Sequence, residues 1–183
     1  MFIESEGVET VAKLMALSAR TAPKSKGSDV IEVKIVFRDE LGALAASMRS
    51  FGEENNLNFF LRDAGNIEKS DCCVIIGVKG DASLGLDCGG CGFPTCSDML
   101  REQKNIRESG RDTAFQGPNC ILRQADLGIA VGSAAKTASI HNTDNRIMFS
   151  AGVGALKLGW PGECTVAYGI PLSASGKSIF FDR

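Results

Sequence analysis

The sequence predicts an α/β fold in which helices flank a sheet, with a small cysteine-rich module inserted into it. Three observations lead to this expectation. Segments with apolar residues at helical spacing alternate along the chain with short apolar runs that are typical of strands. The run at 72–78 is apolar throughout, as in a strand that is buried on both faces. Three cysteines, Cys88, Cys91 and Cys96, lie within nine residues after that run.

The first elements are predicted by their periodicity. Apolar residues recur at helical spacing from Val8 to Ala19, which predicts an amphipathic helix over residues 5–22 that a proline ends. Residues 30–36 predict a mostly buried strand. Helical spacing returns after Asp39, a residue type that caps helices, so a second helix is expected to begin there.

The remaining elements follow from the same patterns. They are a strand at 72–78, a helix at 97–107, a polar exposed stretch at 108–116, a long helix at 121–140, a helix at 145–158 and a strand at 163–170. The helix at 121–140 is poor in bulky side chains, which indicates that something packs closely against it. At 183 residues we expect one α/β domain over 1–183 with an inserted cluster-binding module at 80–121.

Composition and charge argue against several classes of protein. The chain is 44% hydrophobic with a mean hydropathy near zero, and no apolar run reaches the roughly 20 residues of a membrane helix. A net charge of −2 and the lack of a lysine- or arginine-rich run argue against a nucleic-acid partner. The acidic N-terminus lacks the basic head and apolar middle of a signal peptide, so a cytoplasmic protein is expected.

A fourth thiol, Cys120, follows Cys96 after 23 intervening residues. Four thiolates are what a [4Fe-4S] cluster needs, and the glycines between the first three permit tight turns around it. Structural zinc sites usually come as two paired knuckles, whereas Cys120 has no near partner. We therefore predict a [4Fe-4S] site at Cys88, Cys91, Cys96 and Cys120, with zinc and reduced structural thiols as the alternatives.

The other three cysteines are expected to be structural. Cys72 and Cys73 are neighbours in a predicted strand, where adjacent side chains point to opposite faces, so they cannot easily address one metal. Cys164 begins a strand after a Pro-Gly turn. Packing in the core is the favoured interpretation for such thiols.

The segment from Asp87 to Cys96 resembles the small [4Fe-4S] module of corrinoid iron-sulfur proteins and of electron-transport subunits, in which a distant cysteine completes the cluster. The segments 125–133, 144–148 and 169–183 resemble an uncharacterised protein family that contains a ferredoxin domain. This second likeness runs over nearly the whole chain. It implies an iron-sulfur protein that exchanges electrons with a redox partner protein.

A wider similarity links residues 19–24, the strand after them and the C-terminal half to flavin-dependent nitroreductases, in which a helix ending in an Ala-Pro turn leads into the first strand. The resemblance implies a truncated nitroreductase fold, FMN as a second cofactor, and a homodimer with the flavin at the subunit boundary. The arginine-rich opening helix of that family, which helps to hold the FMN phosphate, has no counterpart in this sequence.

The FMN contacts are expected from two groups of residues. Cations in Gly/Ser-rich loops could meet the phosphate, and small residues in the helix at 121–140 leave room for a flat ring. The cations are Lys24, Lys177 and Arg183, and the small residues are Gly128, Gly132 and Ser133.

Electron transfer through one [4Fe-4S] cluster is the function that the sequence favours. The alternatives are an FMN-dependent, nitroreductase-like oxidoreductase fed by the cluster, and a zinc-stabilised structural protein. Neither a nucleophile with an adjacent base nor a dinucleotide-binding fingerprint is visible, so no catalytic residue can be named and enzyme activity is left open.

Overall fold

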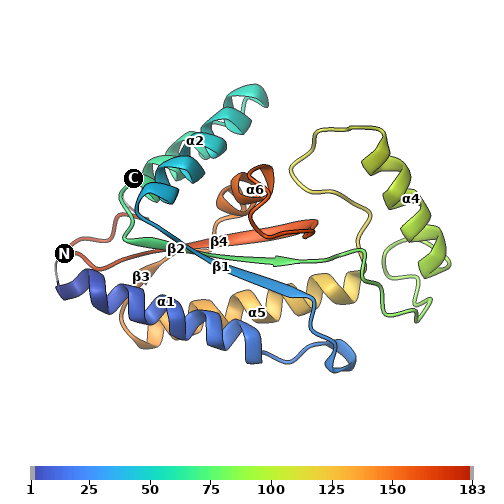
Figure 1. The fold of residues 1–183 in the computed structure, drawn as a ribbon, viewed down its shortest axis with the longest axis horizontal. Helices are drawn as coiled ribbons and strands as arrows, with labels where there is room; N and C mark the ends of the chain where they lie inside the picture. The colour runs from blue at the N-terminus through green and yellow to red at the C-terminus, as the bar shows by residue number, and fades with distance from the viewer. Residues whose placement is uncertain (1–2, 182–183) are drawn as a thin grey trace.

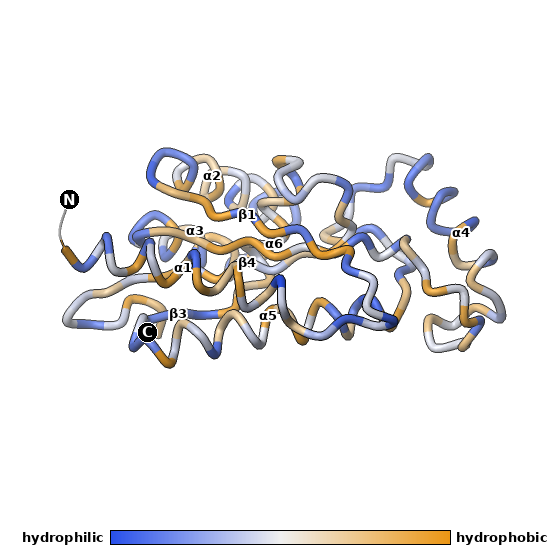
Figure 2. The backbone as a smooth tube through the Cα atoms, turned by 60° about the horizontal axis from the view of Figure 1, so that its bottom comes forward, coloured by the Kyte–Doolittle hydropathy of each residue, from blue (hydrophilic) through white to orange (hydrophobic). Residues whose placement is uncertain are grey.

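The computed structural model describes residues 3–181. Its elements in chain order are α1 (Ile3–Thr21), η1 (Ser25–Gly27), β1 (Ile31–Phe37), α2 (Asp39–Glu54), α3 (Asn58–Glu68), β2 (Cys72–Val78), α4 (Cys96–Glu108), α5 (Ile121–Ile140), β3 (Asp144–Asn145), α6 (Phe149–Lys157) and β4 (Val166–Ser173). Helices α1 and α5 cover one face of the sheet, and α2, α3 and α6 cover the other (Figures 1 and 2). The predicted α/β class is confirmed. Within the described residues, no helix has the length and apolar character needed to cross a membrane.

The sheet has four strands in the order β1-β2-β4-β3, and all of its pairs are antiparallel. Strand β2 lies between β1 and β4, and all seven of its residues are buried. Its alternate side chains enter two separate apolar clusters, with Cys72 on the α1 and α5 side and Cys73 on the α2 and α6 side. The continuous apolar run therefore marks the central strand, and the two neighbouring thiols point to opposite faces as expected.

Glycines allow α6 to pack directly on the backbone of β4. A Cβ atom added at Gly152 would lie 1.9 Å from the carbonyl oxygen of Ala167. One added at Gly169 would lie 2.5 Å from the Cβ of Ala151. Neither position has room for a side chain, so these two glycines set how closely the helix approaches the sheet.

The structure differs from the expected elements in three places. Helix α3 was not predicted, because its short sequence follows two asparagines that resemble a loop. The helix expected at 145–158 begins only at Phe149, since Asn145 belongs to β3 and Met148 exchanges two backbone hydrogen bonds with Gly169. Strand β4 starts three residues later than expected and continues to Ser173.

Helix α4 and the irregular segments before and after it project from one end of the layered body (Figure 1). Figure 2 shows apolar residues concentrated along the strands, whereas α4 is largely polar. Only Met99 and Gln103 of this helix are buried. This projecting part carries Cys88, Cys91 and Cys96, and its return to the body ends at Cys120.

Candidate metal centre

The four predicted ligands lie on three segments that meet at the projecting end of the molecule. Cys88 and Cys91 lie in the irregular loop, Cys96 is the first residue of α4, and Cys120 is the N-cap residue of α5. The Asp87 carboxylate accepts a hydrogen bond from the backbone N–H of Cys96 at 2.7 Å, which joins the start of the loop to α4. Gly90 lies against α5, because a Cβ atom added to it would be 2.7 Å from Cγ2 of Ile121.

The loop has the backbone that its glycines were expected to permit. Gly89 and Gly92 have φ angles of +71° and +88°, and the N–H of Gly92 donates to the carbonyl of Gly89 at 2.9 Å. Within residues 3–181, no three or more cysteine, histidine, aspartate or glutamate side chains lie close enough together to hold a metal ion. The structure thus brings the three cysteine-bearing segments side by side but does not gather their thiols, and the ligand assignment stays a prediction.

Exposure differs sharply among the four thiols. Cys88 is exposed, Cys91 and Cys96 are half-buried, and Cys120 is 6% exposed. Two of the four lie at helix N-termini, Cys96 on α4 and Cys120 on α5, where the partial positive charge of the helix favours an anionic group. Four thiols with such surroundings suit a thiolate-bound, negatively charged group in donor chemistry and in placement.

The remaining cysteines have the properties of core thiols. Burial raises the pKa of Cys72 to about 12 and that of Cys164 to about 12, and it raises the pKa of Cys73 well above its ordinary value. The sulfur of Cys164 packs against Gly77, at 2.9 Å from the position of an added Cβ atom. These three thiols stay protonated at neutral pH and fill space in the core.

A buried polar network surrounds the backbone next to Cys120. The hydroxyl of Thr165 donates to Oδ1 of Asn119 at 2.6 Å and accepts from the N–H of Gly80 at 3.0 Å. The side-chain amide of Gln103, on α4, donates to Oδ1 of Asn119 at 3.3 Å and to the carbonyl of Pro118 at 2.9 Å. The N–H of Cys120 itself donates to the carbonyl of Gly80 at 2.9 Å.

A buried ion pair follows one turn later on α5, and sequence reasoning missed it. The Arg123 guanidinium lies 3.1 Å from the Asp126 carboxylate, and their side chains are 3% and 2% exposed. Arg123 also donates to the carbonyls of Ala82 and Ser28 at 2.7 Å, while Asp126 accepts from the N–H and hydroxyl of Ser25 at 2.8 Å. The available signal was that both charges fall on the buried stripe of α5, where unpaired charges are rare.

A cavity is lined by two of the small residues that were predicted to contact a flavin. Gly128 and Gly132 border a cavity of about 330 Å³ beside α5, and a Cβ atom added to either would meet nothing within 4 Å. The cavity is also lined by apolar side chains and by Gln124, whose Nε2 is buried and has no hydrogen-bond partner. Ser133 is half-buried and does not line it.

The structure does not bring the predicted phosphate-binding cations together. Lys24 directs its ammonium group to the carbonyls of Ala19 and Arg20 at the C-terminal end of α1. Lys177 follows the segment 173–176, which shares a cavity with Glu4 at the other end of that helix. A helix of 19 residues spans about 28 Å, so the two lysines of one chain cannot meet one phosphate. Arg183 lies outside the described residues.

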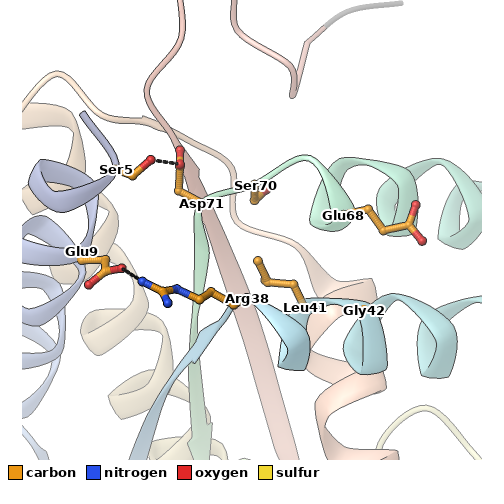
Figure 3. Close-up of a pocket in the computed structure, with 8 residues that line it drawn as sticks. All are labelled: Ser5, Glu9, Arg38, Leu41, Gly42, Glu68, Ser70 and Asp71. Atoms are coloured by element: carbon orange, nitrogen blue, oxygen red, sulfur yellow. Dashed lines mark hydrogen bonds and ion pairs between the residues drawn. The ribbon is translucent and has the colours of Figure 1, made fainter. Parts of the chain in front are cut away.

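A cavity of about 700 Å³ lies at the opposite end of the sheet, where β1 ends and β2 begins. Figure 3 shows the residues that line it. Its charged side chains are already partnered: the hydroxyl of Ser5 donates to Asp71 at 2.9 Å, and Arg38 lies 3.9 Å from Glu9. Strand β2 runs from this end to the cysteine-bearing end, and its six residue-to-residue rises span about 20 Å. This cavity is therefore separate from the candidate metal centre.

Comparison of the sequence with known families and proteins gives two matches. A family described as "Uncharacterized protein containing a ferredoxin domain (DUF2148)" matches residues 116–183, a range that includes Cys120 but not the other three predicted ligands. An uncharacterized protein of Archaeoglobus fulgidus is 44% identical over 180 residues, which cover 98% of this chain and 94% of that protein.

Solved structures with the same fold are nitroreductases. A nitroreductase-like family protein from Bacillus cereus has a TM-score of 0.57 at 10% identity. The match covers 92% of this chain and 75% of the Bacillus cereus chain. The nitroreductase CinD from Lactococcus lactis, solved with nicotinic acid, has a TM-score of 0.56 at 9% identity, covering 95% and 84%. A nitroreductase with bound FMN from Desulfitobacterium hafniense has a TM-score of 0.54 at 13% identity, covering 92% and 78%. The chain therefore belongs to the uncharacterised ferredoxin-domain-containing family, and it has a nitroreductase-like α/β fold.

Proposed function

We propose that this protein transfers electrons through one [4Fe-4S] cluster held by Cys88, Cys91, Cys96 and Cys120. The observation that carries the proposal is the meeting of the three cysteine-bearing segments at one end of the molecule, with two thiols at helix N-termini. When bound, the cluster supplies one-electron redox chemistry. Membership of a family with a ferredoxin domain supports the same class of function.

Binding requires a local movement, because the thiols lie in neighbouring segments and not in one group. The loop of Cys88 and Cys91 is exposed or half-buried, whereas Cys120 is buried in the body. We therefore expect the loop to close toward Cys120 when the metal binds, since metal binding and local folding are coupled. Hydrogen exchange over residues 80–120 should be slower in the loaded protein than in the metal-free protein.

The metal itself is tested on protein purified without oxygen. We expect iron and sulfide in equal amounts and a broad absorbance that dithionite bleaches, whereas zinc without colour would support the structural alternative. Replacing any of the four predicted ligands by serine should sharply reduce the iron content. Cys72→Ser and Cys164→Ser serve as controls and should retain it, because these thiols lie in the core. Full iron in Cys120→Ser would remove that residue from the site.

The second candidate function is an FMN-dependent oxidoreductase, and the cavity beside α5 favours it. The buried Nε2 of Gln124 is an unused donor on the wall of an otherwise mostly apolar cavity, and the edge of a flavin ring carries acceptors for such a donor. Gln124 follows Cys120 by one helical turn, a rise of about 6 Å, so a ring in this cavity would lie next to the cluster.

Titration with FMN tests this second function on cluster-loaded protein. Quenching of flavin fluorescence at micromolar concentrations is expected if the cavity binds the ring, and Gly128→Leu, which places a side chain in the open space, should abolish it. Gly65→Leu is the control, because Gly65 also has open space but lies on α3, away from the cavity. If Lys177→Ala weakens FMN binding, measured by the same quenching, Lys177 contacts the phosphate. Quenching that survives in Gly128→Leu would exclude this cavity as the FMN site.

The proposed partners are a separate redox protein and a second copy of the chain. Cys88 is exposed, which supports a redox partner that approaches the proposed site from solvent. A homodimer would cover Ile129 on α5, which is 46% exposed, and Ile147, which lines the cavity and is 45% exposed. Light scattering after size exclusion tests the dimer. All seven cysteines are free thiols, which supports a cytoplasmic location that cell fractionation would test.

A further inference from the structure

A network of buried side chains holds the backbone next to Cys120. The side chain of Asn119 accepts hydrogen bonds from Thr165 at 2.6 Å and from Gln103 at 3.3 Å, and its amide donates to the carbonyl of Gln116 at 2.9 Å. Thr165 is 1% exposed and Gln103 is 3% exposed. Nearly all the hydrogen-bonding capacity of the Asn119 side chain is therefore used within the protein.

This network ties Cys120 to the ends of two sheet strands. Gly80 lies just beyond β2 and Thr165 lies just before β4, and the two are joined by the bond from the Gly80 N–H to the Thr165 hydroxyl. The Gly80 carbonyl in turn accepts from the N–H of Cys120. A Cβ atom added to Gly80 would lie 2.1 Å from Oδ1 of Asn119, so the backbone and this side chain are in direct contact.

We propose that Asn119 and Thr165 are positioning residues that hold Cys120 in place as a ligand before the metal binds, and that the loop of Cys88 and Cys91 and the start of α4 with Cys96 close onto it. The inference rests on the proposed iron-sulfur function. It adds that Cys120 is a fixed ligand, whereas the other three cysteines move toward it. Neither residue touches the cluster in this proposal; both act through the backbone of Cys120. Loosening their hydrogen bonds should therefore release one ligand and leave the other three in place.

Loss of one thiolate ligand has a specific chemical signature. The iron that Cys120 holds leaves as Fe²⁺, so that [4Fe-4S]²⁺ becomes [3Fe-4S]⁰ plus Fe²⁺ with no net electron transfer. Ferricyanide added as oxidant then takes one electron and produces [3Fe-4S]⁺, which is paramagnetic, whereas intact [4Fe-4S]²⁺ gives no electron paramagnetic resonance signal. A general loss of stability would instead remove the whole cluster.

The test uses Thr165→Val, which keeps the shape of the side chain and removes the hydroxyl. After mild ferricyanide treatment we expect the [3Fe-4S]⁺ signal and about three irons per protein in place of about four. Thr165→Ser keeps the hydroxyl and should behave as wild type. Ser150→Ala is the matched control, because it removes an equally buried hydroxyl bonded to Asp63 at 2.7 Å on the other side of the sheet. If Thr165→Val does not fold, Gln103→Leu removes the second donor to Asn119.

The outcomes separate this inference from the proposed function. A wild-type protein that binds no iron, or a Cys120→Ser variant that resembles wild type, refutes the proposed site and the positioning role with it. A wild-type protein with a full cluster, a Cys120→Ser variant that loses iron, and a Thr165→Val variant without the [3Fe-4S]⁺ signal together overturn the positioning role alone. The same signal in Ser150→Ala would also overturn it, because the effect would then reflect stability in general.

Discussion

Replacing Arg123 by methionine tests how much the buried ion pair on α5 contributes to stability. The substitution removes the 3.1 Å contact with Asp126 and the bonds to the carbonyls of Ala82 and Ser28, and it leaves the carboxylate buried without its cation. Removing one partner of a buried pair costs about 3–5 kcal/mol. For a chain of this size each kcal/mol lowers the unfolding midpoint by about 2–4 °C, so we expect a fall of roughly 6–20 °C.

Thermal and urea unfolding followed by circular dichroism would measure this loss. Arg101→Met is the control, because Arg101 pairs with Asp98 on the exposed side of α4, where an ion pair contributes little to stability. Adding Asp126→Leu to Arg123→Met should recover part of the lost stability, since the unpaired buried charge is then gone. A cost below about 1 kcal/mol for Arg123→Met would refute the expected contribution of this buried pair to stability.

Two further predictions concern the core. Gly152→Ala should lower the free energy of unfolding in urea by about 3 kcal/mol or more, because the new Cβ would meet the backbone of Ala167. Gly65→Ala should raise it by about 0.5–1 kcal/mol, because Gly65 has open space. Equal effects of the two substitutions would contradict the close packing of α6 on β4. Stability should be intact below pH 9.0, the ordinary thiol pKa, and fall as the pH rises toward about 12, because burial raises the pKa of Cys72 and Cys164 and the unfolded thiols ionise first. Alanine at both positions should flatten this alkaline slope, and an unchanged slope would assign it to other groups.

Local sequence patterns predicted the helices and strands that have at least one fully buried face. The helix expected at 121–140 has the bounds of α5, and the run at 72–78 has those of β2, because continuous or periodic apolar residues leave few other ways to bury them. Helix α3 was missed, because it follows Asn55 and Asn56, which resemble a loop, and its N-cap residue Leu57 makes no capping hydrogen bond through its side chain. The antiparallel order of the strands is also absent from local patterns, since it depends on which strands pair across the whole sheet.

By itself the sequence determined the α/β class and the buried inner strand β2, and it predicted the four thiols of the candidate site, because spacing along the chain is a local property. Only the tertiary structure decided that Asn119, the neighbour of Cys120, is bonded to Thr165, that Arg123 and Asp126 form a buried pair, and that Lys24 and Lys177 lie at opposite ends of α1. These relations join residues that lie far apart in the sequence or depend on which face of a helix is covered. They arise when the sheet brings distant segments together, and no spacing rule within a single segment contains that information.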